Sequence, residues 1–222
     1  HEAAADDRGA PRQRVTIIGS GFVSAEFAHV FSSFGVEVTV VARSGRLLRH
    51  EDADISARFT ELARKKWDVR LDQKVLRASR TASGIELELN DGVVETDLVL
   101  VAIGRMPNSD LLNLPAAGVE TTPAGHVVVD AYQRTTAEGV WALGDINQPL
   151  ELKHVANHEA RIVQHNLLNP TTPIRADHRF VPHAVFTSPQ IASVGVTEDE
   201  AREKGVRYVT AKQDYADIAY GW

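Results

Sequence analysis

The stretch Arg14–Arg49, RVTIIGSGFVSAEFAHVFSSFGVEVTVVARSGRLLR, decides the fold of this chain. It opens with an apolar run, Val15–Ile18, of the kind that forms a buried parallel strand. The turn Gly19–Gly21 follows, and then a helical stretch, 22–34, that ends at a glycine. A second apolar run, 36–42, completes the pattern. The stretch therefore predicts a β-α-β unit.

The turn inside this unit predicts dinucleotide binding. Gly19 permits a tight bend, and Gly21 lets the backbone approach a pyrophosphate, which the free N–H groups at the helix N-terminus would bind. The third small position of the pattern is Ser24, which still allows the helix to pack closely on the strand. Because a strand precedes the turn and a helix follows it, the context fits the binding fingerprint. The alternative is an ordinary strand-to-helix turn.

The residues after the second strand indicate which nicotinamide cofactor is bound. An NAD site would place an acidic residue there to hold the ribose 2′-OH. This chain instead places Arg43, Arg46 and Arg49 there, and no carboxylate occurs before Glu51. Guanidinium groups form charge-assisted, forked hydrogen bonds with a phosphate. We therefore predict NADPH rather than NADH; the alternative is a solvated basic loop.

Composition excludes several classes of function. The chain has 222 residues, of which 43% are hydrophobic and 24% charged, so it has enough apolar residues for a core. A net charge of −6 argues against nucleic acid or an anionic membrane as a partner. There are no cysteines, which excludes disulfides, thiolate metal sites and thiol redox chemistry within this sequence and suits a cytoplasmic protein.

Hydrophobic periodicity and turn residues predict the remaining elements. The expected helices are 54–67, with Ile55 facing inward, 151–169, with Leu167 facing inward, and 197–204, with a Thr197/Glu200 capping box. The expected strands are 67–71, an antiparallel meander over 74–97, a fully buried strand at 97–103, and shorter strands at 126–129, 139–143, 183–186 and 206–211.

Four motifs, in this order and spacing, resemble one family. They are GSGFVSAE (19–26), VAIGRMPN (101–108), TTAEGVWALGDI (135–146) and VFTSPQIASVG (185–195). Together they are similar to the pyridine nucleotide–disulfide oxidoreductases, the family of glutathione reductase and dihydrolipoamide dehydrogenase. Within that family, stretches such as LLRHEDADI and LKHVANHEARIVQHNLL resemble the mycothione reductase branch. The resemblance covers nearly everything from Val15 onward.

The resemblance implies an α/β fold with several parts. It implies a lead-in (1–13), a Rossmann-like NADPH-binding domain with a β-meander (14–103), the second half of an FAD-binding domain (104–172) and the start of an α+β dimerisation domain (173–222). The family's FAD-binding glycine motif, its C-x-x-x-x-C redox pair and its H-x-x-x-x-E dyad are absent from this sequence. We therefore expect a truncated central fragment that is inactive alone and has no catalytic residue of its own.

The resemblance also assigns cofactor contacts. The residues implied to bind NADPH are Gly19, Ser20, Gly21, Phe22, Val23, Arg43, Arg49 and Gly104. The residues implied to lie against FAD are Glu26, Asp145 and Lys153. Phe22 falls where the family often has an aromatic gate over the nicotinamide, and Glu26 falls where an acidic residue pairs with a lysine. Ser44 stands where glutathione reductases have a histidine.

The implied reaction passes hydride from NADPH to FAD and electrons on to a small disulfide, mycothiol disulfide in this branch, in a cytoplasmic homodimer. Two alternatives remain open: a standalone NADP(H)-binding module without catalysis, and a fragment of a dihydrolipoamide dehydrogenase-like NAD enzyme. We expect no metal site. The histidines at 154, 158 and 165 share a predicted helix, but their H-x-x-x-H-E order lacks the catalytic zinc pattern, so packing is favoured.

Overall fold

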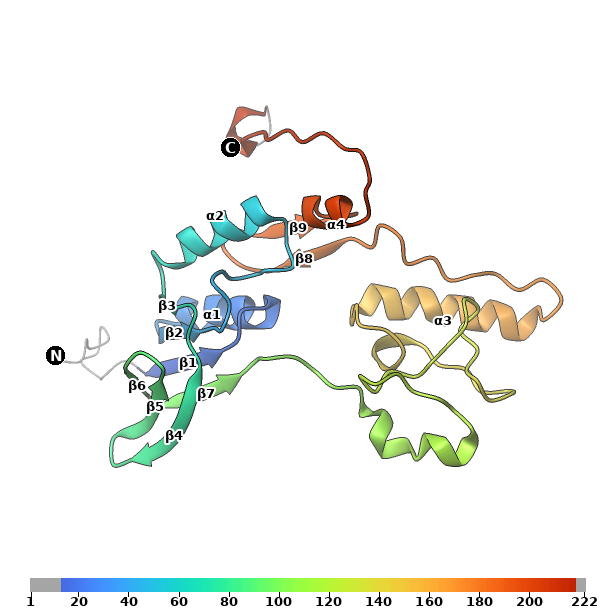
Figure 1. The fold of residues 1–222 in the computed structure, drawn as a ribbon, viewed down its shortest axis with the longest axis horizontal. Helices are drawn as coiled ribbons and strands as arrows, with labels where there is room; N and C mark the ends of the chain where they lie inside the picture. The colour runs from blue at the N-terminus through green and yellow to red at the C-terminus, as the bar shows by residue number, and fades with distance from the viewer. Residues whose placement is uncertain (1–12, 219–222) are drawn as a thin grey trace.

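The apolar run before the glycine turn forms β1 (Arg14–Ile18), the strand around which the first lobe is built (Figure 1). β1 pairs in parallel with β2 (Glu37–Val41) and with β7 (Leu98–Val101), and β3 (Asp68–Arg70) extends the sheet to the order β3-β2-β1-β7. The structure is a computed structural model that describes residues 13–218. The expected lead-in, 1–13, lies outside the described residues except for Gln13. The predicted β-α-β unit is confirmed.

Two layers cover the parallel sheet. α1 (Phe22–Ser33) and α2 (Ala53–Ala63) pack on one face, where the buried core includes Ile17, Ala28 and Phe59. The predicted meander forms as β4 (Val75–Thr81), β5 (Gly84–Leu89) and β6 (Val93–Thr96), all antiparallel, and its apolar residues pack with Val41 in a second cluster.

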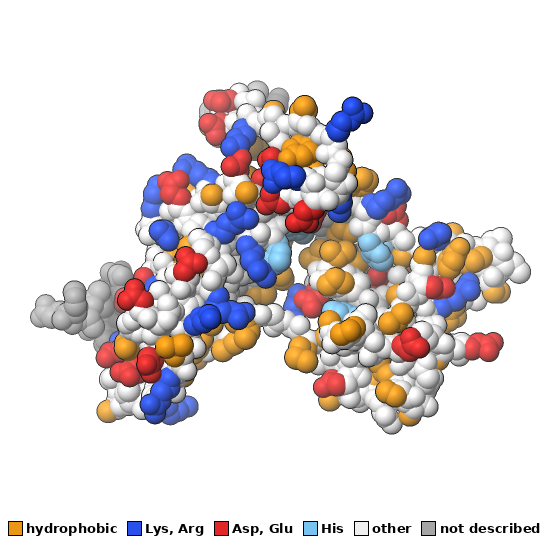
Figure 2. All heavy atoms as spheres, viewed as in Figure 1, with side chains coloured by type: hydrophobic (Ala, Val, Ile, Leu, Met, Phe, Trp, Pro, Cys, Tyr) orange, Lys and Arg blue, Asp and Glu red, His pale blue; other side chains and the backbone are white. Residues whose placement is uncertain are grey.

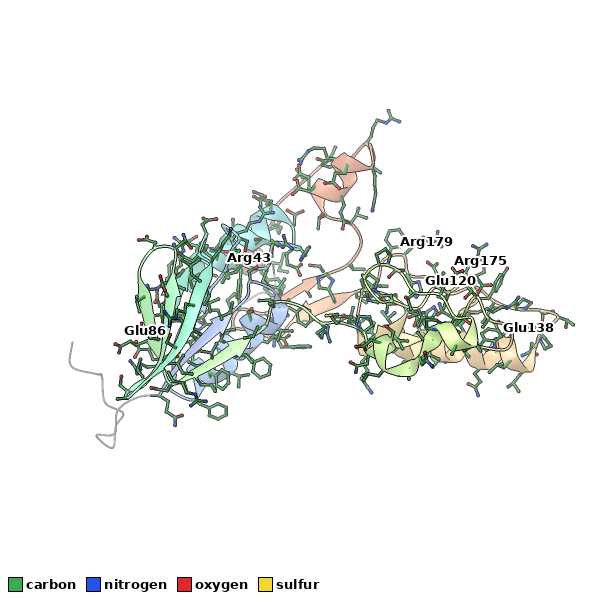
Figure 3. All side chains as sticks on the ribbon, turned by 60° about the horizontal axis from the view of Figure 1, so that its bottom comes forward. Arg43, Glu86, Glu120, Glu138, Arg175 and Arg179 are labelled. Carbon is green, nitrogen blue, oxygen red and sulfur yellow. The ribbon has the colours of Figure 1, made fainter. Side chains whose placement is uncertain are left out.

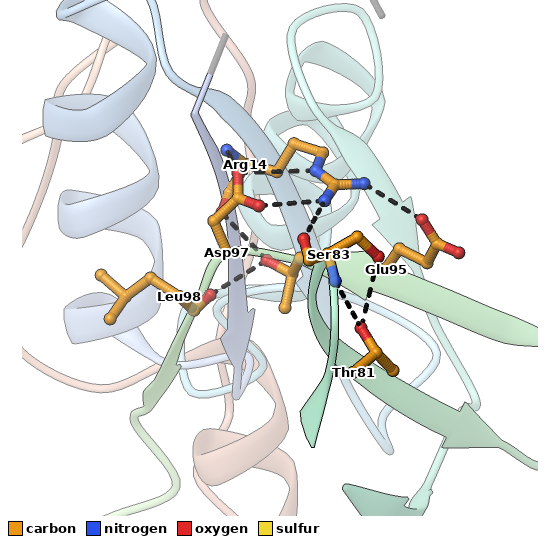
Figure 4. A network of polar contacts seen from close by, with 7 residues as sticks. Arg14, Thr81, Ser83, Glu95, Asp97 and Leu98 are labelled. Carbon is orange, nitrogen blue, oxygen red and sulfur yellow. Dashed lines mark hydrogen bonds and ion pairs between the residues drawn. The ribbon is translucent and has the colours of Figure 1, made fainter. Parts of the chain in front are cut away.

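An ion-pair network ties the meander to the start of β1 (Figure 4). The Arg14 guanidinium donates to the Asp97 carboxylate at 2.9 Å and to Glu95 at 3.4 Å, and the Arg14 backbone N–H donates to Asp97 at 2.8 Å. The hydrogen bond from the Arg14 side chain holds the pKa of Asp97 below its ordinary value. The buried Thr96 hydroxyl donates to the Arg14 carbonyl oxygen, which fixes the same junction.

The second lobe is built mostly from turns around one long helix. Short 3-10 turns at η1 (Asn108–Leu112), η2 (Leu114–Ala117) and η3 (Gly144–Ile146) precede α3 (Lys153–Leu168). The predictions of strands at 126–129 and 139–143 are wrong. These apolar runs make only isolated bridges, such as Arg134 with Trp141, because each segment meets its partner at one residue pair.

The chain then returns to the first lobe as a hairpin of β8 (His183–Val185) and β9 (Ile191–Ser193) (Figure 1). Val185 and Ile191 join the same core cluster as β1 and α1. α4 (Glu198–Glu203) follows, with the predicted capping box confirmed, and the chain continues to η4 (Tyr215–Asp217). The predicted strand at 206–211 is wrong, because these residues lie exposed and pair with no strand in the described part of the chain.

Four details of the predicted burial and length are also wrong. β7 is an edge strand, so Leu98 and Val101 are 50% and 60% exposed instead of fully buried. α2 ends at Ala63 because the chain turns there, which brings Trp67 edge-on to the ring of Phe59. Ile55 and Leu167 lie on the solvent faces of their helices.

No helix of the described residues is long and apolar enough to cross a membrane.

Candidate functional site

The glycine turn after β1 combines a tight bend with an open surface. Gly19 has φ +142°, and a Cβ atom there would lie 2.2 Å from the carbonyl oxygen of Ala102, the residue just after the neighbouring strand β7. Gly21, in contrast, has an ordinary φ of −81°, and a Cβ atom there would meet nothing within 4 Å. Gly19 is therefore required by the fold, whereas the backbone at Gly21 is accessible to a ligand.

The start of α1 presents unpaired donors at this surface. Backbone N–H groups of the first turn, including Phe22 and Val23, have no acceptor within the helix. No acidic side chain lies in that turn to compete for them. The positive end of the helix dipole adds to their attraction for an anion. The residues present thus fit a pyrophosphate group.

The loop after β2 places arginines at the same edge of the sheet, because the carboxyl ends of parallel strands lie together. Arg43, on the first lobe in Figure 3, and Arg49 are exposed. No acidic side chain among residues 13–218 forms an ion pair with either of them. Leu47 and Leu48 anchor the loop in the core. Two charged guanidinium groups are thus available near the glycine turn.

Phe22 takes part in a contact between the two lobes that the sequence did not predict. The residue is 41% exposed, and the Arg105 guanidinium lies 5.7 Å from the centroid of its ring. Arg105 also forms a 2.5 Å ion pair with Glu151, in the segment before α3. Gly104, beside Arg105, has φ +132° and lies exposed three residues after the end of β7. The VAIGRMPN motif was a signal for Arg105, but nothing in the sequence pointed to Glu151.

A groove of about 400 Å³ lies beside this contact, and Asp145 is one of the residues that line it. Its lining residues are Arg105, Met106, Pro107, Asn108, Asp145, Ile146 and Glu151. The turn that carries Asp145 is fixed from behind, because the fully buried carboxylate of Glu159 accepts a 2.5 Å hydrogen bond from the Gly144 N–H. The other oxygen of Glu159 lies 2.7 Å from His178 Nε2. Lys153 begins α3 and is exposed.

Glu26 points toward the C-terminal hairpin. Its Oε1 accepts a 2.9 Å hydrogen bond from the backbone N–H of Phe186, just after β8. No lysine among the described residues forms an ion pair with it. The surface is hollowed between the two lobes (Figure 2).

The histidines of α3 are engaged in packing contacts. His154 Nε2 lies 2.9 Å from the Pro182 carbonyl oxygen, and His165 Nε2 lies 3.1 Å from that of Thr172. His158 accepts from the Asp177 backbone N–H at 3.3 Å. Within the described part of the chain, no group of three or more His, Cys, Asp or Glu residues could hold a metal ion. These contacts support the packing interpretation of the three histidines.

Comparison with known proteins assigns the chain to a family. The family model described as "Pyridine nucleotide-disulphide oxidoreductase" matches residues 2–160. The model for the dimerisation domain of the same family matches residues 181–222. The chain belongs to the pyridine nucleotide-disulphide oxidoreductase family. The resemblance found from the four motifs is thereby confirmed, and so is the α/β fold class.

Individual members of this family are similar over most of the chain. Mycothione reductase from Mycobacterium tuberculosis is 53% identical over 215 residues, which are 95% of this chain and 47% of that protein. Mercuric reductase from Staphylococcus aureus is 38% identical over 198 residues, covering 87% of this chain and 36% of that protein. The chain thus spans about half the length, or less, of the curated relatives it matches.

Solved structures of the family share the fold. The HOCl-induced flavoprotein disulfide reductase RclA from Escherichia coli matches with a TM-score of 0.84 and 30% identity, covering 93% of this chain and 48% of that one. LpdA from Mycobacterium tuberculosis matches with a TM-score of 0.79 and 32% identity, covering 89% of this chain and 43% of that one.

Proposed function

We propose that the protein carrying this chain is an NADPH-dependent flavoprotein disulfide reductase, with mycothiol disulfide as its substrate. The observation that carries the cofactor assignment is the pair of exposed arginines, Arg43 and Arg49, on the loop beside the glycine turn. The similarity to mycothione reductase, higher than that to the mercuric reductase, supports the substrate.

The proposed NADPH site uses the first lobe. The backbone of Gly19, Ser20 and Gly21 and the free N–H groups at Phe22 and Val23 would bind the pyrophosphate. The two arginines would bind the 2′-phosphate, since each offers a planar fork of donors to its oxygens.

The nicotinamide would then extend toward Phe22 and Gly104. The ring of Phe22 is held from one side by Arg105, which is itself fixed by Glu151. This contact would orient the ring that covers the nicotinamide.

The proposed FAD site uses the groove at the second lobe. Asp145 is exposed in that groove and is a hydrogen-bond acceptor suited to the hydroxyl groups of a ribityl chain. Lys153, at the N-terminus of α3, and Glu26 would lie toward the flavin. Bound FAD would accept hydride from NADPH and pass the electrons to a disulfide. Because this sequence has no cysteine, the thiol–disulfide exchange would use cysteines that are not in it.

We propose the domain division that the resemblance implied: the NADPH-binding part at 14–103, the FAD-binding part at 104–172 and the dimerisation part from 173. The two-lobed arrangement and the return of the chain as a hairpin support these boundaries (Figure 1). We further propose a homodimer, supported by the match to a dimerisation domain. A cytoplasmic location fits a reductase of small disulfides, because that compartment keeps thiols reduced.

Turnover assays on the full-length protein test this function. NADPH and NADH would each be paired with mycothiol disulfide, glutathione disulfide and lipoamide. We expect bound flavin and the highest kcat/KM for NADPH with mycothiol disulfide. A preference for NADH with lipoamide would favour the dihydrolipoamide dehydrogenase-like alternative. Nucleotide binding without flavin or turnover would favour the standalone binding module.

A further inference from the structure

Glu51 is a buried carboxylate whose partners come from a distant part of the chain. The residue is 8% exposed. Its Oε1 lies 2.7 Å from His183 Nε2, and its Oε2 accepts a 2.6 Å hydrogen bond from the Ser193 hydroxyl. Burying a carboxylate is costly unless its oxygens are hydrogen-bonded. Here the β8–β9 hairpin supplies a partner for each oxygen, from both of its strands.

The backbone of Glu51 is joined to the loop that carries the arginines. The Glu51 N–H donates to the carbonyl oxygen of Leu48 at 2.9 Å, which closes a turn around Arg49. Leu48 has φ +52°, a conformation that a leucine adopts only when its surroundings enforce it. The Leu48 N–H donates in turn to the carbonyl oxygen of Ser20 at 2.7 Å. The loop is therefore held between the glycine turn and Glu51.

The next residue strengthens the same junction. Asp52 caps α2 through a hydrogen bond from the Asp54 N–H, and its other carboxylate oxygen accepts from the Glu198 N–H at 3.1 Å. Two adjacent carboxylates thus join the end of the arginine loop to the hairpin and to the start of α4. The C-terminal segment is in this way attached to the loop as well as to the apolar core.

We propose that Glu51 is a positioning residue for cofactor choice. By binding His183 and Ser193, it fixes the turn that carries Arg49, so that the guanidinium groups of the loop face the 2′-phosphate of NADPH. The inference rests on the proposed NADPH site. Forked hydrogen bonds need a fixed geometry of donor and acceptor. If the loop were not held in place, ordering it on binding would cost free energy and weaken the affinity for NADPH. NADH lacks the 2′-phosphate and so makes no contact that needs the arginines, and NADPH binding therefore depends on this junction more than NADH binding does.

Binding measurements on the full-length protein test the proposal. Calorimetry would give Kd for NADPH and for NADH, and urea unfolding would report stability. The preference is measured by the Kd for NADH divided by the Kd for NADPH. We expect Glu51→Ala to lower this ratio about tenfold, while the Kd for NADH itself changes less than about twofold. Glu51→Gln keeps an oxygen acceptor and should lose less. His183→Ala should shift the ratio in the same direction as Glu51→Ala, and it serves if Glu51→Ala does not fold.

Lys66→Met is the matched control. The Lys66 Nζ donates to the Ser188 carbonyl oxygen at 2.6 Å, so it also joins the first lobe to the hairpin, but from the chain after α2. We expect this variant to keep the wild-type ratio, and Arg43→Ala to abolish the preference.

Two results would overturn the proposal and leave the NADPH site standing: an unchanged ratio in Glu51→Ala, or an equal loss in Lys66→Met. A wild-type protein without any NADPH preference would instead refute the NADPH site itself, and the role of Glu51 with it.

Discussion

Replacing Gly21 with alanine should weaken dinucleotide binding and leave the fold intact, whereas the same change at Gly19 should damage the fold. At Gly21 the backbone conformation is open to alanine, and the new methyl group would touch nothing in the protein. We expect a change of at most about 0.5 kcal/mol in the free energy of unfolding, because the loss of a good N-cap residue and the gain in chain stiffness nearly cancel.

At Gly19 two costs add together. The φ of +142° is strained for alanine, at about 1–3 kcal/mol. The methyl group would also overlap a backbone carbonyl oxygen at 2.2 Å, which no side-chain rotation relieves. Overpacking of this kind costs about 1–3 kcal/mol. Together they predict a loss of about 4 kcal/mol for Gly19→Ala.

The methyl group at Gly21 would instead occupy the surface that a pyrophosphate approaches. Losing one or two charge-assisted hydrogen bonds to backbone N–H groups weakens binding by about 1.5–3 kcal/mol each, or at least about tenfold in Kd. Urea unfolding followed by tryptophan fluorescence and calorimetric titration with NADPH measure the two quantities. Wild-type affinity for NADPH in Gly21→Ala, or a loss of more than about 1 kcal/mol in its free energy of unfolding, would contradict the different roles assigned to the two glycines.

Three further predictions concern stability. Asp97→Asn should cost about 1 kcal/mol at pH 7, a value kept small by solvent screening. Arg14 lowers the pKa of Asp97 in the folded state, so the stability difference between wild type and Asp97→Asn should be present above pH 3.8 and shrink as the pH falls further. Urea unfolding midpoints at pH 7 and about pH 3 measure this change, and a difference that stays constant would contradict the prediction. Ser24→Ala should be neutral or stabilise by about 1 kcal/mol, since its buried hydroxyl has no hydrogen-bond partner among residues 13–218, and a clearly lower Tm would contradict this. Glu159→Ala should cost about 3 kcal/mol, because the Gly144 N–H and His178 lose a buried acceptor, and Glu159→Gln should cost less; equal losses by urea unfolding would count against this.

Local patterns predicted the first lobe well. The β-α-β unit and the meander follow from periodicity and turn residues within short stretches. These local patterns predict the structure correctly because the strands involved pair with strands that are close to them in the sequence. The segments 126–129 and 139–143 do not form the predicted strands, although each is an apolar run. Strand formation depends on a partner of matching length, and these segments find one only at single bridges.

Contacts between distant residues could not be predicted. Glu51 and His183 are 132 positions apart, and nothing in either local sequence signals that they meet. The same holds for the ion pair between Arg105 and Glu151. The candidate cofactor residues came from motifs, and the structure adds the side chains that hold those motifs in place.

The most direct test of the proposed NADPH site is the Kd of the full-length protein for NADPH and for NADH, measured by calorimetry for the wild type and for Arg43→Ala. We expect the wild type to bind NADPH at least about tenfold more tightly, because charge-assisted hydrogen bonds to the 2′-phosphate are available only to NADPH. We also expect Arg43→Ala to lose most of this preference with little change in NADH binding. Equal affinity for both cofactors in the wild type, or tighter binding of NADH, would contradict it.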